Sequence, residues 1–453
     1  MERIRAFCVE AFDEVTLADQ KLMTSFNSAK PVDDLLPDSL VDHLFRHHSA
    51  KIVAALTRVF GSHNLQLAED VVQDALIRAL QTWPFQGVPD NPTAWLTQVA
   101  KHRALDLIRR ESLWAQKQAE LERVLPQHTT EFPPVERDEP DDQLAMILMC
   151  CHPAIPREAQ LALTLKVACG FSVTEIARAL LAQEEAIAKR IVRAKKHIRD
   201  QAITLELPAP GQLPQRLDAV LHVVYLLFNE GYSATQGENL LREDLCVEAI
   251  RLGQLLAAHP RTNAPQVHAL LALLMLQAAR LPARTKAGGA LALLAEQDRS
   301  LWDRRLIAAG LRHLGQAAAG EALTRYHLQA EIAALHVAAV RDAETDWQAI
   351  AALYEELYQL DASPIVLLNR AIAVARWQGA TAGIRLLAEI EHHPSLRTYH
   401  LLPAVLADLW RQAGDYRQAA TYYQTALALP CTEPERQFLQ RQLSQLDLAE
   451  ATR

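Results

Sequence analysis

The sequence predicts an all-α protein built from several helical domains. The chain has 453 residues, half of them hydrophobic, with only 15 glycines and 6% aromatic residues. Apolar residues recur at intervals of three and four along most of the chain, which is the period of amphipathic helices. Near the C-terminus, similar segments begin at Thr345, Gly379 and Gly414, a spacing typical of stacked helical repeats. We therefore expect two small helical domains followed by a large α-helical extension.

Composition limits the partners and cofactors that can be expected. The formal net charge is −8, which argues against a uniformly cationic nucleic-acid coat and restricts DNA contact to local basic faces. The six cysteines form no CxxC pair and indicate reduced thiols of a cytoplasmic protein. We expect no cofactor and no metal, although Cys150, Cys151 and His152 leave a metal site open as the minor alternative. No apolar run approaches the ~18 residues of a membrane span, so no membrane contact is expected.

The first helical domain is predicted over residues 38–110, after a weakly patterned leader at 1–37. A helix over 40–60 is followed by one over 65–84, which Pro84 is expected to end. The second helix has a short polar face that is expected to be exposed, and a solvated surface alone would explain it. This face consists of Glu69, Asp70, Gln73 and Asp74.

A third helix, over 95–110, follows a loop rich in proline and glycine. This loop and helix combine aromatic and basic side chains, as Phe85, Trp95, Lys101, His102, Arg103, Arg109 and Arg110. Such a combination suits single-stranded DNA, because cations follow the backbone while aromatic rings stack on unpaired bases. Arg103 projects toward the packing side of the helical wheel, so an ion pair with Asp70 or Asp106 competes with DNA contact there.

The second domain, residues 141–203, ends in a predicted helix-turn-helix. Ser172 and Glu175 can form a capping box at the start of its first helix. In its second helix an apolar stripe lies opposite a cationic side, as in a helix that enters a DNA major groove. An amphipathic hairpin with a solvated basic face is the alternative. The stripe is Ile187, Ile191, Ala194 and Ile198, and the cations are Lys189, Arg190, Arg193, Lys196 and Arg199.

These segments resemble bacterial RNA polymerase sigma factors. AEDVVQDALIRAL is followed by NPTAWLTQVAKHRALDLIRR and, about 60 residues later, by the helix-turn-helix. The compact two-domain layout over residues 40–203 resembles the extracytoplasmic-function group. The resemblance implies core RNA polymerase and promoter DNA as partners, without covalent chemistry.

The resemblance also implies roles for individual residues. The polar face Glu69, Asp70, Gln73 and Asp74 would bind the clamp helices of the polymerase β′ subunit, while the second domain would meet the β flap. The aromatic and basic residues from Phe85 to Arg110 would capture and melt the −10 promoter element. The helix at 184–199, together with Ser172 and Thr174 before it, would contact the −35 element.

Residues 111–140 are predicted to be an acidic linker. The resemblance suggests that it could lie in the RNA-exit path of the polymerase, and a plain flexible spacer is an equally good interpretation. From about residue 204 the chain continues beyond a minimal sigma factor. This resembles the subgroup with a long helical C-terminal extension, here divided into residues 204–340 and a tetratricopeptide-like part at 341–453. Such repeats stack into a solenoid with a concave surface for a protein partner.

Residues 214–340 contain polar clusters within apolar helices, around Asn229–Arg242 and Arg284–Arg304. Buried ion-pair networks are the favoured explanation and a ligand pocket is the alternative. The favoured interpretation is a sigma factor regulated through its extension. Two rivals remain: a stand-alone helix-turn-helix regulator with a solenoid sensor, and an enzyme housed in residues 214–340. The sequence contains no HExxH, G-x-S-x-G or phosphate-binding glycine loop that would support the enzyme.

Overall fold

The computed structural model describes residues 37–120, 140–180, 182–232, 241–285 and 290–451. The described part is all-α, as predicted, with a single isolated β-bridge between Thr285 and Leu291. The described residues divide into two compact units, one that ends at residue 223 and one that begins at residue 224. The predicted leader at 1–36 and the linker at 121–139 lie outside the described residues.

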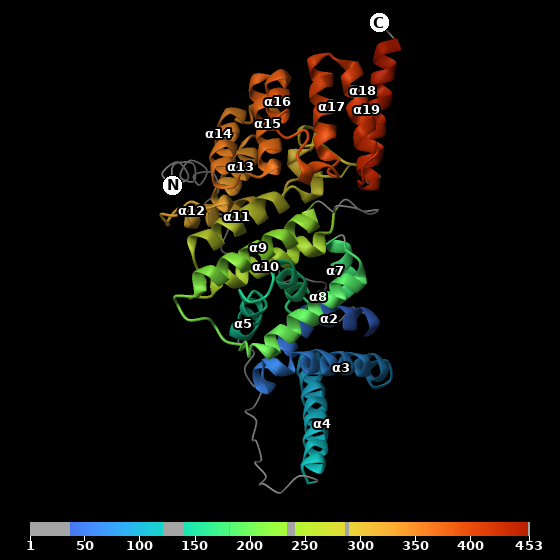
Figure 1. Cartoon of the computed structure of the whole chain (residues 1–453), viewed down its shortest axis with the longest axis vertical. Helices are drawn as coiled ribbons and strands as arrows, with labels where there is room; N and C mark the ends of the chain where they lie inside the picture. Colours follow the sequence, from blue (N-terminus) through green and yellow to red (C-terminus); the bar gives the residue numbers. More distant parts are fainter. Residues whose placement is uncertain (1–36, 121–139, 181, 233–240, 286–289, 452–453) are drawn as a thin grey trace. The chain divides into compact units, whose positions relative to one another are not determined.

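The first unit contains the two predicted small domains. Figure 1 shows α3 and α4 as a crossing pair, with α4 running away from α3. The helices of the first small domain are α2 (Pro37–Phe60), α3 (Leu65–Gln86) and α4 (Pro92–Glu120). Those of the second are α5 (Pro140–Cys150), α6 (Arg157–Val167), α7 (Val173–Ala179) and α8 (Glu184–Asp200), and they precede α9 (Leu213–Tyr232).

Two predicted helix ends were wrong. Pro84 lies inside α3, which continues to Gln86 and ends where Gly87 adopts φ 84°. A proline in the last turn costs one hydrogen bond but leaves the preceding turns intact, and the glycine, which tolerates positive φ, provides the actual stop. The helix predicted over 95–110 begins at Pro92 and runs to Glu120, so the predicted linker starts ten residues too early.

The second unit is a continuous series of helices. Its first part holds the rest of α9, then α10 (Glu243–Ala258), α11 (Pro265–Ala278), α12 (Arg304–Ala317) and α13 (Arg325–Ala338). Pro265–Ala283 is apolar and long enough to cross a membrane by composition alone, which the sequence expectation overlooked. Its apolar stretch is 72% buried inside the protein, as in the core helix of a globular domain.

The predicted repeats coincide with helix pairs. Each repeat starts with a new helix, and Asp346 and Asp415 cap two of these by accepting hydrogen bonds from the backbone N–H groups of Ala349 and Gln418. Figure 1 shows α14 to α19 standing side by side. The pairs are α14 (Trp347–Leu360) with α15 (Pro364–Gln378), α16 (Ala380–Leu387) with α17 (Leu401–Ala413), and α18 (Tyr416–Leu427) with α19 (Glu433–Ala451).

The core of this part has no break between pairs. One apolar cluster joins Leu328 of α13 to α14 and α15, and the next joins Leu368 of α15 to α16 and α17. A third cluster joins Ala407 of α17 to Tyr423 of α18 and to α19. Each pair buries its apolar face on its neighbours, which is the arrangement of a solenoid. Its assignment to the tetratricopeptide class stays a prediction.

Candidate polymerase and DNA interfaces

Helix α8 has the amphipathic geometry expected of a DNA-reading helix. Ile187, Ile191, Ala194 and Ile198 are its buried residues, the same four that the sequence pattern selects. Its N-terminal partner α7 begins with the predicted capping box. Ser172 Oγ accepts from the Glu175 N–H at 3.1 Å, and the Ser172 N–H donates to Glu175 Oε2 at 2.8 Å. The four buried residues therefore determine which side of α8 faces solvent.

The cations of α8 fall into two groups. Lys189 pairs with Glu185 one turn earlier at 2.7 Å, and Arg190 pairs with Glu158 of α6 at 3.1 Å. Arg199 lies 3.5 Å from Asp200. Among the described residues, Arg193 and Lys196 are exposed and have no recorded ion pair. The uncompensated charge of the helix is therefore centred on Arg193 and Lys196.

An apolar residue that the sequence analysis missed lies on this cationic side. Val192 is 64% exposed and falls between Arg199 and Lys196 on the helical wheel. The signal was present in the sequence, because Val192 is the one valine of the helix outside its buried stripe. An exposed apolar group beside cations suits the C5-methyl group of thymine in a major groove.

Helix α3 carries the predicted polymerase-binding face. Asp70, Gln73 and Asp74 are exposed, and Asp70 accepts a hydrogen bond from Gln66 Nε2 at 2.7 Å. Glu69 was expected on the same exposed face, and this was wrong. Its side chain is only 8% exposed and forms an ion pair with Lys195 of α8. A helix more than a hundred residues later covers this carboxylate, which no local pattern could reveal.

The predicted −10 residues gather at the α3–α4 junction. Phe85 is 89% exposed at the end of α3. Trp95 is half-buried and packs edge-on against the buried Trp83, with ring centroids 5.5 Å apart. Asn91 Oδ1 accepts the Ala94 N–H at 3.0 Å and so helps to start α4. Of the five basic residues predicted on α4, Lys101 is half-buried and the other four are exposed, namely His102, Arg103, Arg109 and Arg110.

Arg103 does form an ion pair, but with a different partner from the two expected. Its Nε lies 3.3 Å from Oδ2 of Asp74, rather than against Asp70 or Asp106. The pair joins the predicted −10 helix to the predicted polymerase-binding face. Both side chains are about half exposed, so the pair contributes little to stability and leaves both groups accessible.

Two further polar bridges connect the small domains of the first unit. Lys195 Nζ also donates to Oε1 of Gln66 at 2.8 Å. Arg58 near the end of α2 pairs with Asp142 at the start of α5, with Nε and Oδ2 3.1 Å apart. Helix α3 is thus tied to α8, and α2 to α5.

The cysteine pair is buried and poorly reactive. Cys150 and Cys151 are free thiols at the end of α5. Burial raises the pKa of Cys151 to about 12, and burial followed by the neighbouring Cys151 raises that of Cys150. No group of three or more metal-ligating side chains occurs among the described residues. High pKa values disfavour the thiolate that metal binding and redox chemistry require.

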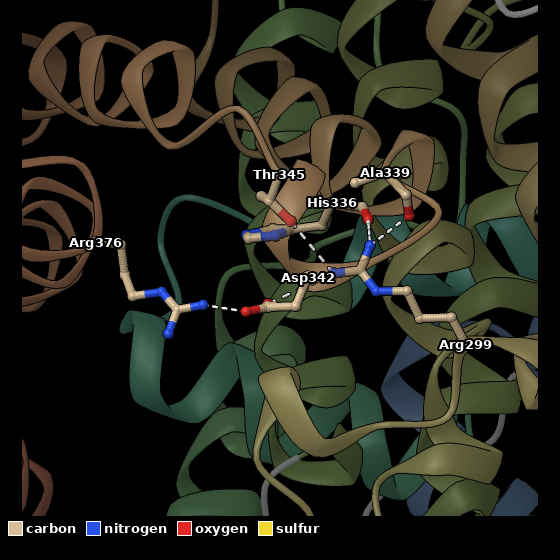
Figure 2. Close-up of polar contacts among 6 residues, drawn as sticks. All are labelled: Arg299, His336, Ala339, Asp342, Thr345 and Arg376. Carbon is tan, nitrogen blue, oxygen red and sulfur yellow. Dashed lines mark hydrogen bonds and ion pairs between the residues drawn. The ribbon is translucent and has the colours of Figure 1, made fainter.

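In the extension, the conspicuous polar cluster is an ion-pair network (Figure 2). Arg299 is buried and its Nη1 donates to the carbonyl oxygens of His336 at 2.9 Å and Ala339 at 2.5 Å, at the end of α13. The Nη2 atom of Arg299 donates to Thr345 Oγ1 at 3.3 Å. Asp342 lies 3.7 Å from Arg299 and also pairs with Arg376 of α15. The network therefore holds the α13–α14 turn against α15, as the favoured explanation predicted.

Neighbouring rings complete this cluster. Arg299 and Arg280 lie over the ring of Trp302, and Arg376 lies over that of Trp347. Burial, and then the charges of these three arginines, lower the pKa of His336 to about 3. The imidazole therefore stays neutral at physiological pH and functions as a packing group.

Comparison with known proteins agrees with this geometry. Residues 44–113 match the model of sigma-70 region 2, and residues 145–198 match sigma-70 region 4. Residues 216–318 match DUF6596, a family of unknown function. An uncharacterised protein of Rhizobium meliloti (strain 1021) is 38% identical over 405 residues, which cover 88% of this chain and 94% of the relative. No solved structure matches.

The region 2 match covers the acidic face of α3 and the aromatic–basic junction with α4, and the region 4 match covers the helix-turn-helix. Sigma factors are non-enzymatic transcription initiation factors that act with core RNA polymerase on DNA. The chain belongs to the sigma-70 factors, as an extracytoplasmic-function-type sigma factor with a long helical C-terminal extension.

Proposed function

We propose that this sigma factor recognises both elements of its promoters in the cytoplasm, reading −35 with α8 and opening −10 with the α3–α4 junction. The geometry of α8 supports the proposal most directly. Its four apolar residues are buried while Arg193, Lys196 and Val192 are exposed together. Cations bind the phosphate backbone and an apolar contact adds base selectivity. Ser172 and Thr174, which precede α8, contact the DNA phosphate backbone beside the residues of α8.

The −10 element is opened at the α3–α4 junction. Phe85 projects into solvent and offers a ring on which an unpaired base stacks, while Trp95 is braced by Trp83. Lys101, His102, Arg103, Arg109 and Arg110 then provide a cationic track along α4 for the separated strand.

Core polymerase is held through the acidic face of α3, with the β′ clamp helices as partner and the β flap contacting the 141–203 domain. Asp70 is its best test, because it is exposed and, within the described part of the chain, accepts a hydrogen bond from Gln66 alone. Asp70→Lys should abolish holoenzyme assembly, since reversal of an interfacial charge opposes docking directly. Asp106→Lys, an equally exposed change on α4, should co-elute normally with core enzyme.

Unchanged co-elution of Asp70→Lys with core polymerase would refute the proposal that the acidic face of α3 binds the enzyme. Failure of the wild-type protein itself to co-elute would favour the alternative, a stand-alone helix-turn-helix regulator with a solenoid sensor.

The extension is proposed to regulate the sigma domains, with its tetratricopeptide-like surface open to a protein partner. The DUF6596 match begins at residue 216, inside α9. The first part of α9 already belongs to the first unit, where Arg216 Nη1 donates to the Leu148 carbonyl at 2.8 Å and Asp218 lies 3.7 Å from Arg157. These contacts support an influence that begins at the 141–203 domain.

A truncated chain must therefore keep the part of α9 that contacts the 141–203 domain. A chain that ends near Leu205 loses Arg216 and Asp218, whereas one that ends after Val223 keeps both. Transcription from a defined template should differ between the full-length protein and the chain that ends after Val223. Equal transcription from both would exclude regulation by the extension.

A further inference from the structure

The polymerase-binding face of α3 is partly occupied by the protein itself. Glu69 and Gln66 lie on α3, and both are held by Lys195 of α8. The Glu69 side chain is 8% exposed and that of Lys195 is 13% exposed. A second pair, Arg58–Asp142, joins α2 to α5 at 3.1 Å, with Asp142 nearly buried. Two charge pairs from four different helices therefore join the same two domains.

The buried position of the Glu69 carboxylate is unfavourable in free energy unless Lys195 lies beside it. A carboxylate removed from water is strongly destabilised unless an opposite charge and hydrogen bonds compensate it. Lys195 supplies that charge to Glu69, and Lys166 of α6 also feels the Glu69 charge, which raises its pKa against the larger lowering by burial. Glu69 thus inserts into the cationic inner side of the 141–203 domain.

The Lys195–Glu69 contact hinders the binding of core polymerase and leaves the DNA-binding side of α8 accessible. Glu69 cannot contact polymerase while Lys195 covers it. In contrast, Arg193, Lys196 and Val192 stay exposed, because Lys195 lies at the edge of α8 and not at the centre of its cationic side. The contact therefore blocks part of the polymerase-binding face while the DNA-reading surface of α8 remains open.

We propose that the 141–203 domain is an intramolecular competitor of core polymerase for α3, held closed by the Lys195–Glu69 and Arg58–Asp142 pairs. The proposal rests on the polymerase-binding role of α3 given above. Core enzyme binds only the open form, so the apparent dissociation constant is the intrinsic constant divided by the open fraction. Weakening either pair raises that fraction and tightens holoenzyme assembly.

The Arg58–Asp142 pair gives the cleanest test, since neither residue is assigned to polymerase or DNA. Full-length Arg58→Asp and Asp142→Arg should each bind immobilised core polymerase more tightly than wild type, by on the order of fivefold. The charge-swapped double variant should return to the wild-type affinity. Lys195→Met should also bind more tightly, while Lys51→Met, which removes an exposed charge from α2, should not.

A second measurement detects the closed form without polymerase. A carbodiimide should condense the Lys195 amine with the Glu69 carboxylate, and mass spectrometry of peptides would identify the cross-link. The cross-linked protein should fail to bind core enzyme, and prior addition of core enzyme should prevent the cross-link.

The outcomes separate the two proposals. Single variants that bind core enzyme no more tightly than wild type, or a double variant that shows no return, would overturn the closed-form inference while the sigma-factor function stands. Absence of core binding by the wild type and every variant would overturn the role of α3, and this inference with it.

Discussion

Arg103 of α4 donates to Asp74 of α3 through a 3.3 Å contact between Nε and Oδ2. It therefore joins a residue assigned to −10 DNA with one assigned to polymerase. Because both side chains are about half exposed, the pair should contribute no more than about 1 kcal/mol to stability.

Arg103→Ala should therefore lower the free energy of unfolding by less than about 1 kcal/mol, yet reduce promoter opening clearly. Urea unfolding measures the first effect and permanganate reactivity of −10 thymines the second. Asp74→Asn is the matched control when both variants are assayed at saturating core polymerase, because it breaks the pair and leaves the arginine available to DNA. Normal opening by Arg103→Ala would restrict this residue to a structural role.

Arg193 is the exposed, unpaired arginine of the α8 surface among the described residues. Arg193→Ala should cost about 1–3 kcal/mol in promoter affinity and relax selectivity at one base pair if the guanidinium reads a base. If it contacts phosphate alone, binding should weaken on all sequences and the salt slope should fall by about one. Arg190→Ala should lose less, because Glu158 already engages that guanidinium. Binding unchanged in both affinity and salt slope would remove Arg193 from the interface.

Val192 should contact a thymine methyl group in the −35 element. Replacing the thymines one at a time with deoxyuridine should reveal one position where wild-type affinity falls about fourfold, the loss of one buried methyl group. Val192→Ala should be insensitive to deoxyuridine at that same position and respond normally elsewhere. Equal sensitivity of both proteins at every thymine would exclude the contact.

The stability of the extension should decrease in mild acid. His268 of α11 and His313 of α12 stack with ring centroids 5.2 Å apart and with their Nδ1 atoms at 3.0 Å. Burial, and then His268, lower the pKa of His313 to about 4, and burial lowers the pKa of His268. Well above pH 6.5 the neutral pair contributes fully, because folded and unfolded chains then bind equal numbers of protons.

As the pH falls from 6.5 toward 4, His313 becomes protonated in the unfolded chain but stays neutral in the folded chain. The free energy of unfolding should therefore fall by up to about 1.4 kcal/mol per pH unit. Urea titrations at pH 7 and pH 5 would measure the decrease. His313→Gln should show a smaller decrease, and the remainder belongs to His336 and the other buried histidines. Equal pH dependence in variant and wild type would refute the assignment to His313.

Local patterns correctly predicted the all-α fold and the amphipathic character of α8. Ile187, Ile191, Ala194 and Ile198 are all buried because the helical period and the Ser172–Glu175 capping box depend only on residues within a few turns. The repeat starts at Thr345, Gly379 and Gly414 coincide with new helices for the same reason. The end of α4 was missed because charged residues after Arg110 were interpreted as linker, although no proline or glycine stands there to stop the helix.

Contacts between distant segments were beyond such patterns. The burial of Glu69 depends on Lys195, and the partner of Arg103 depends on how α4 crosses α3. The sequence singled out Arg299, yet its bonds to the end of α13 require the folded chain. Each of these facts joins segments that no local period connects.

The burial of Glu69 also affects how mutational scans of this protein should be interpreted. Replacing Glu69 with alanine removes a candidate contact to polymerase and, at the same time, releases Lys195. The two effects on holoenzyme assembly have opposite signs and can cancel. A scan that scores each position by a single binding constant would then record Glu69, the carboxylate with two roles, as neutral. Asp70, which has only the role in polymerase binding, would show a clear loss.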